Sequence, residues 1–279
     1  MLIIESQKKI HESLRDIENI ALIPTMGNLH EGHIALIETA KKISQTIVVT
    51  IFVNPIQFNS KKDLDAYPRT LEKDIKILEK LNVNFLFTPT VKDMYPTPPN
   101  LNYKLPKISH ELCGATRPEH FEGVITIIEK LFDLFKPAYA IFGKKDYQQL
   151  YLIKKFTLEC SYSTKIIEIE TCRETNKLAL SSRNNLLKFE MKEKAVELYL
   201  NLNKLVTLSK SISMLSNLEL NARENLEKNG WEVDYIEVRR QSDLKKPIEN
   251  DSQLIALGAA TLNGIRLIDN IEFCIETLN

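Results

Sequence analysis

The sequence has no surplus of charge of either sign and no long apolar run. Of its 279 residues, 37 are Lys or Arg and 37 are Asp or Glu, so the formal net charge is +0. This balance gives no sign of a nucleic acid or an anionic membrane surface as a partner. No apolar stretch approaches the length that spans a bilayer. Residues 1–6 also lack the basic region and apolar core of a signal peptide.

Cysteine is scarce as well, with four widely scattered residues and no C-x-x-C pair. These residues are Cys113, Cys160, Cys172 and Cys274. Unpaired thiols that serve as small packing residues are typical of a reducing compartment. We therefore expect a cytoplasmic protein.

Two common nucleotide-binding motifs are absent. The chain contains neither G-x-x-x-x-G-K-[ST] nor G-x-G-x-x-G, which disfavours a P-loop fold and an ordinary dinucleotide fold. It contains instead PTMGNLHEGH at residues 24–33, after an apolar run at residues 20–23. Apolar residues at helical spacing follow from Ile34 to Ile43, and a β-branched run follows at residues 46–53. The motif is therefore predicted to be the first turn of a βαβ unit.

A turn that opens a helix suits a phosphate, because the helix start offers free N–H groups and a partial positive charge. Gly27 and Gly32 let the backbone approach a ligand, and His30 and His33 would project from one face. Imidazoles beside a phosphate can stabilise charge on a transferring phosphoryl group. An isolated H-x-G-H also fits a helix-capping loop with two surface histidines. A metal pair is disfavoured, because no acidic or cysteine partner lies at ligand spacing.

Three further segments carry polar groups where a predicted strand ends or a new helix begins. Asn54 and Gln57 follow the strand at residues 46–53, and residues 143–149, with Lys145, Asp146 and Gln149, follow a strand at residues 138–142. Ser181, Ser182 and Arg183 form a run that suits an anion. Taken singly, these segments also fit ordinary turn chemistry, an exposed charged turn and a serine-capped helix start.

The order of predicted elements indicates an α/β fold with a Rossmann-like parallel sheet flanked by helices, plus a smaller C-terminal α+β domain. The larger domain is predicted at residues 1–171 and the smaller one at residues 172–279. Helices are expected at residues 7–17 and after Thr70, with Leu71, Ile75 and Leu78 on the buried face. Residues 89–119 form a proline-rich excursion. The smaller domain is expected to hold two helices at residues 190–229 and strands at 231–239, 253–260 and 265–269.

In a doubly wound sheet, the carboxyl ends of neighbouring strands line one crevice. The polar segments would therefore meet, with Ser181, Ser182 and Arg183 covering the crevice from the second domain. Two histidines, a lysine and an arginine suit a polyphosphate, and neutral amides suit a small polar co-substrate. The residues alone thus predict an ATP-using transferase or ligase.

Six segments together resemble the pantothenate synthetase (pantoate–β-alanine ligase) family in order and spacing. The H-x-G-H element alone is shared across a wide nucleotidyltransferase superfamily, whereas the whole set is much more selective. The similarity runs from Met1 to about Asp269. The segments are residues 24–33, 52–58, 67–70, 117–123, 143–149 and 180–184.

The resemblance implies ATP-dependent condensation of pantoate with β-alanine through a pantoyl adenylate, with release of AMP and pyrophosphate. It implies Mg²⁺ with ligands that the sequence does not identify, and a homodimer through the larger domain. It implies catalytic roles for His30, His33 and Lys145, with His33 in the position of the proton donor. Gln57 would contact both pantoate and β-alanine, and Gln149 would contact pantoate. The implied ATP-binding residues are Met26, Gly27, Asn28, Leu29, His30, Glu31, Gly32, His33, Gly143, Lys144, Lys145, Asp146, Cys172, Leu180, Ser181, Ser182 and Arg183.

Two residues depart from the family pattern. Lys144 stands where the family usually has an acidic residue, which is expected to make that turn more basic. Lys177 stands where glycine is common, so a positive φ there would cost about 1 kcal/mol. Two other functions stay open: another H-x-G-H nucleotidyltransferase that moves AMP onto a phosphorylated acceptor, and a protein that binds ATP without turnover.

Overall fold

The computed structural model describes residues 1–99, 101 and 103–275. Its larger sheet has six parallel strands in the spatial order β1-β4-β3-β2-β5-β6. The chain leaves β2 toward β3 on one side and later returns to β5 on the other, so the strand order reverses beside β2. Ligands bind at such a reversal in open α/β sheets. The strands are β1 (Leu2–Ile4), β2 (Ile20–Thr25), β3 (Thr46–Ile51), β4 (Phe85–Phe87), β5 (Tyr139–Gly143) and β6 (Lys165–Ile169).

Helices cover both faces of this sheet, which explains the continuous apolar runs of its strands. In β2, Ile20 and Leu22 pack in one core together with residues of α1, α7 and α8. Ala21 and Ile23 point the other way, into a core shared with α2 and α4. The helices are α1 (Gln7–Leu14), α2 (Glu31–Ile43), α3 (Lys61–Ala66), α4 (Leu71–Lys80), α5 (Val91–Met94), α6 (Cys113–Thr116), α7 (His120–Phe135) and α8 (Tyr147–Glu159). Short 3₁₀ turns are η1 (Pro55–Gln57), η2 (Lys107–His110) and η3 (Lys144–Asp146).

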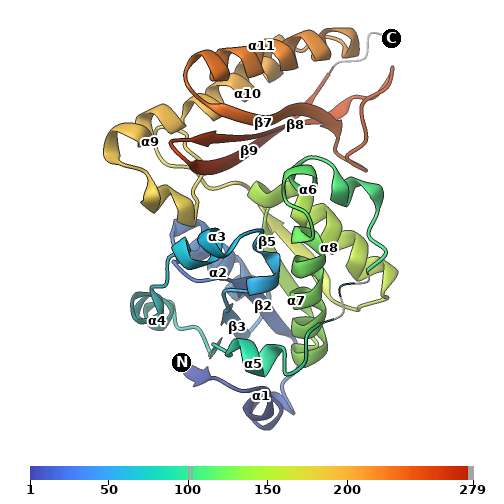
Figure 1. Ribbon diagram of the computed structural model, residues 1–279. Coiled ribbons are helices and arrows are strands. Elements are labelled where there is room, and N and C mark those ends of the chain that lie inside the picture. Colours follow the sequence, from blue (N-terminus) through green and yellow to red (C-terminus); the bar gives the residue numbers. More distant parts are fainter. Residues whose placement is uncertain (100, 102, 276–279) are drawn as a thin grey trace.

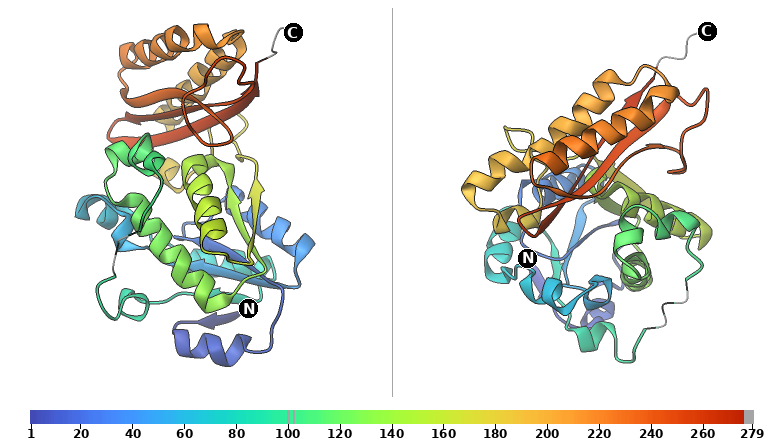
Figure 2. Two further views of the ribbon diagram at one scale, coloured as in Figure 1. Left: turned by 90° about the vertical axis from the view of Figure 1, so that its right-hand side faces the viewer. Right: turned by 45° about the horizontal axis from the view of Figure 1, so that its top comes forward.

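The C-terminal part forms a three-stranded antiparallel sheet whose two faces have different neighbours (Figures 1 and 2). In β8, Leu254 and Ala256 pack in a core with α10 and α11. Ile255 and Leu257 point the other way and pack with Leu112 and other residues of the larger part. The elements are β7 (Glu232–Arg240), β8 (Gln253–Leu262), β9 (Ile265–Cys274), α9 (Phe189–Ala195), α10 (Glu197–Leu208), α11 (Leu215–Lys228), η4 (Ser182–Leu186) and η5 (Ile212–Met214).

The predicted fold class is confirmed: a parallel Rossmann-like sheet with helices on both faces and a smaller α+β unit at the C-terminal end. The division at residues 171 and 172 stays a prediction. Residues 100 and 102 of the predicted 89–119 excursion, and residues 276–279 of the second predicted domain, lie outside the described residues.

Several element predictions are wrong in detail. The edge strand β1 was not expected, α1 ends at Leu14, and β9 continues to Cys274. The excursion contains the short helices α5 and α6, and three helices and a 3₁₀ turn occupy the region where two helices were expected. Leu71 is 42% exposed, whereas Asp74 on the same helix is 1% exposed. The predicted buried face of α4 is confirmed at Leu78, which is 0% exposed, and is wrong at Leu71, because the Asp74 carboxylate takes the inward position near the start of the helix.

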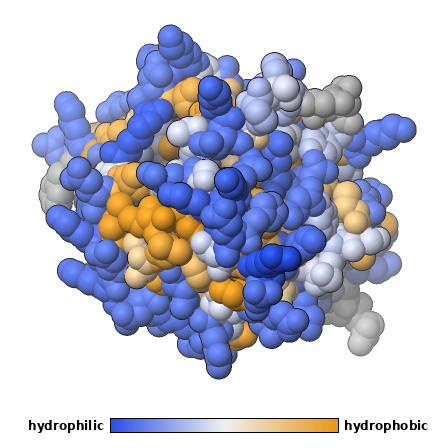
Figure 3. All heavy atoms as spheres, turned by 90° about the horizontal axis from the view of Figure 1, so that it is seen from below, coloured by the Kyte–Doolittle hydropathy of each residue, from blue (hydrophilic) through white to orange (hydrophobic). Residues whose placement is uncertain are grey.

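Exposed apolar residues occur on β1 and α5, two elements at the lower end of Figure 1. Met1, Leu2 and Ile3 are 37%, 51% and 39% exposed, and Val91 is 49% exposed. Seen from below, apolar residues gather on one side of the surface (Figure 3). Within the described ranges, no helix is both long and apolar enough to cross a bilayer.

Candidate active site

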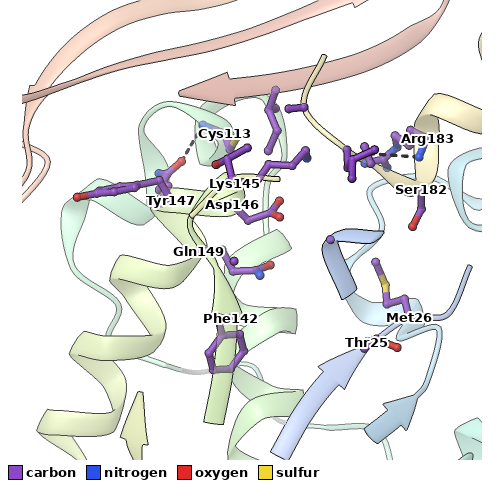
Figure 4. A pocket seen from close by; sticks show the side chains of 18 of the residues that line it. Thr25, Met26, Cys113, Phe142, Lys145, Asp146, Tyr147, Gln149, Ser182 and Arg183 are labelled. Atoms are coloured by element: carbon purple, nitrogen blue, oxygen red, sulfur yellow. Dashed lines mark hydrogen bonds between the residues drawn. The ribbon is translucent and has the colours of Figure 1, made fainter. Parts of the chain in front are cut away.

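A cleft of about 310 Å³ lies between the two sheets. Its walls come from the carboxyl ends of β2 and β5, the starts of α2 and α8, the segment 178–184 and residues 267–270 of β9. Figure 4 shows Met26, Ser182 and Arg183 on one side of the hollow, with Lys145, Asp146 and Gln149 opposite. The cleft thus opens where the strand order of the larger sheet reverses.

Most of the predicted site residues line this cleft, although they come from segments far apart in the sequence. Those that line it are Met26, His30, Gly32, His33, Gln57, Gly143, Lys145, Asp146, Gln149, Cys172, Leu180, Ser181, Ser182 and Arg183. The predicted ATP-binding residues outside the lining are Gly27, Asn28, Leu29, Glu31 and Lys144. The roles of both groups stay predictions.

The turn between β2 and α2 is held by a buried carboxylate. Gly27 and Asn28 have φ of +81° and +52°, so the chain makes a tight reversal before the helix. Asp74 of α4 accepts hydrogen bonds from the backbone N–H groups of Asn28 and Leu29, both at 2.9 Å. Thr70, the residue before α4, donates its hydroxyl to Asp74 at 3.0 Å. Asp74 therefore fixes the shape of the loop that presents the two histidines.

The two histidines use the same ring nitrogen to accept hydrogen bonds from the backbone. Nδ1 of His30 accepts from Gly32 N–H at 3.1 Å, and Nδ1 of His33 accepts from His30 N–H at 3.2 Å. The ring centroids are 4.1 Å apart. Because Nδ1 is an acceptor in each neutral ring, the ring proton sits on Nε2. Each histidine therefore offers one N–H donor from a ring of fixed orientation.

Both imidazoles are held in the neutral form. Burial, followed by the positive charge of Lys145, lowers the pKa of His30 from 6.5 to about 4. Burial, His30 and Lys145 lower the pKa of His33 to about 3. At neutral pH these side chains can donate hydrogen bonds, but they carry no stored proton to transfer.

The amide of Gln57 is oriented by a buried chain of hydrogen bonds. Tyr95 donates its hydroxyl to Asn54 Oδ1 at 2.9 Å, and Asn54 Nδ2 donates to Gln57 Oε1 at 3.0 Å. Asn54 Nδ2 also donates to the carbonyl of Gly123 at 3.0 Å. A Cβ at Gly123 would lie 2.5 Å from the carbonyl oxygen of Ile56, so only glycine allows η1 to pack against α7. Gln57 Nε2 donates to Met26 Sδ at 3.1 Å, which leaves one of its two N–H groups as a donor for a ligand.

The backbone of Gln57 is held from the other side by Arg117 and His120. His120 Nδ1 donates to the Gln57 carbonyl at 2.8 Å, and Arg117 Nη2 donates to the same oxygen at 3.3 Å. Arg117 Nη1 lies 3.0 Å from His120 Nε2, which accepts because Nδ1 carries the proton. Burial and then the Arg117 charge lower the pKa of His120 to about 3. His120 is therefore a neutral link between Arg117 and Gln57.

The Lys145 turn is held from the second sheet. Asn270 of β9 is 6% exposed and donates its amide to the carbonyls of Lys144 and Lys145, at 3.0 and 2.9 Å. Asp269, the preceding residue, forms a two-pronged ion pair with Arg173 at 2.7 and 2.8 Å. The smaller unit thus contributes contacts that fix the backbone of Lys145.

The covering segment contacts the histidine turn directly. Ser182 accepts from Asn28 Nδ2 through its carbonyl at 3.1 Å and donates its hydroxyl to the Asn28 carbonyl at 3.3 Å. Arg183 pairs with both carboxylate oxygens of Asp63 at 3.1 Å. Ser181, Ser182 and Arg183 therefore lie over the cleft, with the guanidinium directed toward α3.

Comparison with known proteins assigns the family. A family model described as pantoate-beta-alanine ligase matches residues 2–272. This chain belongs to the pantoate-beta-alanine ligase family. The pantothenate synthetase of Shewanella loihica is 43% identical over 258 residues, which cover 92% of each chain.

Solved structures of this family agree. The pantothenate synthetase of Thermus thermophilus has a TM-score of 0.90 at 32% identity, covering 97% of this chain and 99% of that one. The pantoate-beta-alanine ligase of Francisella tularensis, complexed with beta-gamma ATP and beta-alanine, has a TM-score of 0.76 at 34% identity over 97% of each chain.

The two departures from the family pattern have different outcomes in the structure. Lys144 was expected to make its turn more basic, and this expectation is wrong. Its ammonium pairs with Glu170 at 2.6 Å and with Glu272 of β9 at 2.7 Å, so two carboxylates balance its charge. Lys177 has a φ of +81°, the conformation for which the glycine common in the family is suited.

Sequence reasoning missed the residues that hold the site in shape. Asp74, Tyr95 and Asn270 are separated from their partners by 41 to 126 residues, so no local pattern could reveal those contacts. Arg117 and His120 were noted only as part of a family segment, with no role assigned. The available signal was their residue type: polar groups inside apolar helices and strands need partners.

Proposed function

We propose that this chain condenses pantoate with β-alanine at the expense of ATP, through a pantoyl adenylate, and releases AMP and pyrophosphate. Membership of the pantoate-beta-alanine ligase family supports this function. The observation that carries it is the meeting of the His30–His33 turn, Lys145, Gln57 and Gln149 in one cleft. The first two features suit a polyphosphate, and the two amides suit a small polar acid.

In the first step, a carboxylate oxygen of pantoate attacks the α-phosphorus of ATP, and the bond from that phosphorus to the β-phosphate oxygen breaks. Pyrophosphate leaves with the electron pair. The Nε2–H groups of His30 and His33 would donate hydrogen bonds to the phosphate oxygens as their charge grows, and Lys145 would neutralise part of it. Their low pKa values favour hydrogen bonding and not full proton transfer as the role of His33.

In the second step, the neutral amine of β-alanine attacks the acyl carbon, the acyl–oxygen bond to phosphorus breaks, and AMP leaves. A proton is lost from the new amide nitrogen. Gln149 would hold the pantoyl group, and Gln57 would contact both acid and amine. Separating adenylation from amide formation turns a poor acyl donor into a good one.

Mg²⁺ is part of the proposal, and the donor set of the cleft fits it. Magnesium commonly takes one or two carboxylates together with substrate phosphates. Of the described cleft carboxylates, Glu170 pairs with Lys144 and Asp269 with Arg173, whereas Asp146 has no ion-pair partner. Within the described ranges, no three His, Cys, Asp or Glu side chains cluster as metal ligands. Asp146 and the phosphates would hold the ion together, and the ion would offset the negative charge of the phosphates.

A homodimer through the larger domain and a cytoplasmic location complete the proposal. The exposed edge strand β1 and the exposed apolar residues on β1 and α5 support a contact between two copies. All four cysteines are free thiols, which supports a reducing compartment. Analytical ultracentrifugation tests the dimer, since a sedimenting species of one chain's mass at micromolar concentration would contradict it.

The function is tested by following AMP and pyrophosphate release from Mg·ATP, with pantoate present and β-alanine either added or withheld. Steady AMP release is expected only with both substrates. Pantoate alone should release about one pyrophosphate per site, because the adenylate stays bound. No response to pantoate would refute the assignment and favour a nucleotidyltransferase with another acceptor.

A further inference from the structure

Four cationic side chains line the cleft, and two of them are already paired. Arg183 pairs with Asp63 at 3.1 Å, and Arg266 pairs with Asp234 at 2.7 Å. Lys145 and Arg117 have no ion-pair partner within the part of the chain that the structure describes. Two positive charges of the cleft are therefore available for anionic ligands.

These two charges lie at different places. Lys145 lies beside the histidine turn, where its charge acts on both His30 and His33. Arg117 lies beside η1, where it donates to the carbonyl of Gln57. The phosphates of ATP need cations beside the histidine turn, so Lys145 suits them. Arg117 suits a second anion beside Gln57.

Arg117 is anchored, and donors remain for a ligand. Its Nη1 lies 3.0 Å from His120 Nε2, its Nη2 donates to Gln57 O at 3.3 Å, and its Nε donates to Asn59 Oδ1 at 3.3 Å. A guanidinium has five N–H donors, so two are left, one on each terminal nitrogen. Burial lowers the pKa of Arg117 to about 10, which leaves it charged at neutral pH. Such a group can grip a carboxylate with two parallel hydrogen bonds.

The chemistry of the proposed reaction indicates which carboxylate this is. The carboxylate of pantoate loses its charge when it becomes the adenylate, so a permanent cation there would stabilise the starting acid. The carboxylate of β-alanine keeps its charge from binding to product. We propose that Arg117 binds the carboxylate of β-alanine and that His120 and Asn59 hold the guanidinium for this purpose. This inference rests on the proposed function.

The site would fix the position of the second substrate by the distance between its carboxylate partner and its amine partner. Arg117 and Gln57 are joined through one carbonyl, so the carboxylate partner and the amide that contacts the amine keep a fixed separation. A carboxylate bound at Arg117 would place the amine of β-alanine toward the acyl carbon. An amine without a carboxylate would lose this placement, although its nucleophilic nitrogen is the same.

The first experiment uses the unmodified enzyme and compares β-alanine with n-propylamine, which has the same chain without the carboxylate. Single-turnover AMP release from preformed pantoyl adenylate is measured for each amine at a pH where both are partly neutral. We expect kcat/KM to be at least about 100-fold higher for β-alanine, because two charge-assisted hydrogen bonds are lost. Equal values for the two amines would overturn the proposal, whether or not any variant folds.

The second experiment uses Arg117→Gln and Arg117→Lys, with Arg266→Gln as the matched control. Arg266 also lines the cleft but is paired with Asp234. Arg117→Gln should raise KM for β-alanine about 10- to 100-fold. It should lower the ratio of kcat/KM for β-alanine to kcat/KM for propylamine by the same factor. Arg117→Lys keeps the positive charge but loses the parallel N–H donors of the guanidinium, so its KM for β-alanine should lie between those of Arg117→Gln and the parent. Arg266→Gln should leave the preference for β-alanine over propylamine unchanged.

The two half-reactions separate this inference from the proposed function. Because Arg117 also holds the Gln57 carbonyl, the pyrophosphate burst with pantoate alone should slow in both Arg117 variants, but by a smaller factor than the KM for β-alanine rises. A raised KM for ATP with an unchanged KM for β-alanine would mean that Arg117 binds the phosphates of ATP. This result would overturn the inference and leave the proposed ligase function intact. A parent enzyme with no pyrophosphate burst would refute the proposed function itself.

Discussion

Each of the two cleft histidines has its Nδ1 tied to a backbone N–H and its proton on Nε2. This arrangement follows from their positions at the start of α2, where backbone donors lack partners within the helix. The same contacts that cap the helix thereby set the tautomer. Capping and catalysis are therefore two consequences of one geometry at His30 and His33.

Replacing His33 with alanine should lower the rate of adenylation about 100- to 1000-fold, because the developing phosphate charge loses a fixed donor. The loss of the cap should cost only about 1 kcal/mol in the free energy of unfolding. Pyrophosphate-burst kinetics and urea denaturation measure the two effects. His11→Ala on the exposed surface of α1 is the control. A His33→Ala enzyme with the parent's burst rate would rule out the role.

The neutral histidines also make the stability depend on pH. His33 and His120 have pKa values of about 3 in the folded chain and about 6.5 when unfolded. Below pH 6.5 the unfolded state takes up protons that the folded state refuses, so stability falls as the pH drops toward 3. Each histidine contributes up to about 1.4 kcal/mol per pH unit in that window. Urea midpoints at pH 7.5 and 5.5 test this, and His33→Ala should show a smaller difference between them than the parent.

At the scale of elements, the site depends on short turns whose backbone is fixed by groups from elsewhere. The β2–α2 turn is held by Asp74 of α4, and η3 is held by Asn270 of β9. The turn around Lys177 is closed by hydrogen bonds from Lys177 N–H to the Glu174 carbonyl at 2.8 Å and from Arg173 to the Lys177 carbonyl at 3.1 Å. Of the three turns, only the one around Lys177 has a positive φ at a residue that does not favour it.

Lys177→Gly should stabilise the protein, because glycine accepts a φ of +81° without steric cost. The gain is limited to about 1 kcal/mol, since glycine also raises the entropy of the unfolded chain. Thermal and urea unfolding measure the change. Lys204→Gly is the control, because Lys204 is exposed inside the helix α10, where glycine should lower the stability. Equal effects at the two positions would show that Lys177 carries no strain.

At the scale of the whole molecule, the two sheets form one structure through apolar and polar contacts. Residues of β8 share an apolar cluster with Leu112 and Phe121. Around it, Glu272 pairs with Lys144 and accepts the Tyr147 hydroxyl at 3.0 Å. The smaller unit therefore does more than cover the cleft, because it fixes the turn from which Lys145 projects.

Asn270→Ala should lower adenylation by about tenfold or more, because two hydrogen bonds to the Lys145 turn are lost. If Asn270 acts through Lys145, the same change in a Lys145→Ala background should cause no further loss. Asn201→Ala is the matched control: Asn201 is also 6% exposed in this unit and donates to the Glu197 carbonyl at 2.8 Å. The Asn201→Ala enzyme should be less stable than the parent but should keep the parent's adenylation rate. Additive losses for Asn270 and Lys145 would contradict the coupling.

Much of the fold could be predicted because its patterns are local. The buried parallel strands appear as apolar runs, the helices as apolar residues at helical spacing, and the turn at residues 24–33 as a break between them. The site was predictable to the same extent, since parallel strands align their carboxyl ends and bring His30, Gln57 and Lys145 to one edge. Leu71 was wrongly placed on the buried face of α4, because apolar periodicity does not show that the Asp74 carboxylate accepts two backbone hydrogen bonds inside the protein.

The sequence by itself determined the apolar strands, the nucleotide turn and the polar residues that follow the strands, because each depends on neighbours within a few positions. Only the tertiary structure decided which charges are free. Lys144 is neutralised by Glu272 and Arg183 by Asp63, whereas Lys145 and Arg117 have no ion-pair partner among the described residues. Pairing depends on distances in space between residues up to 128 positions apart, and Coulomb energy follows distance in space and not separation in sequence.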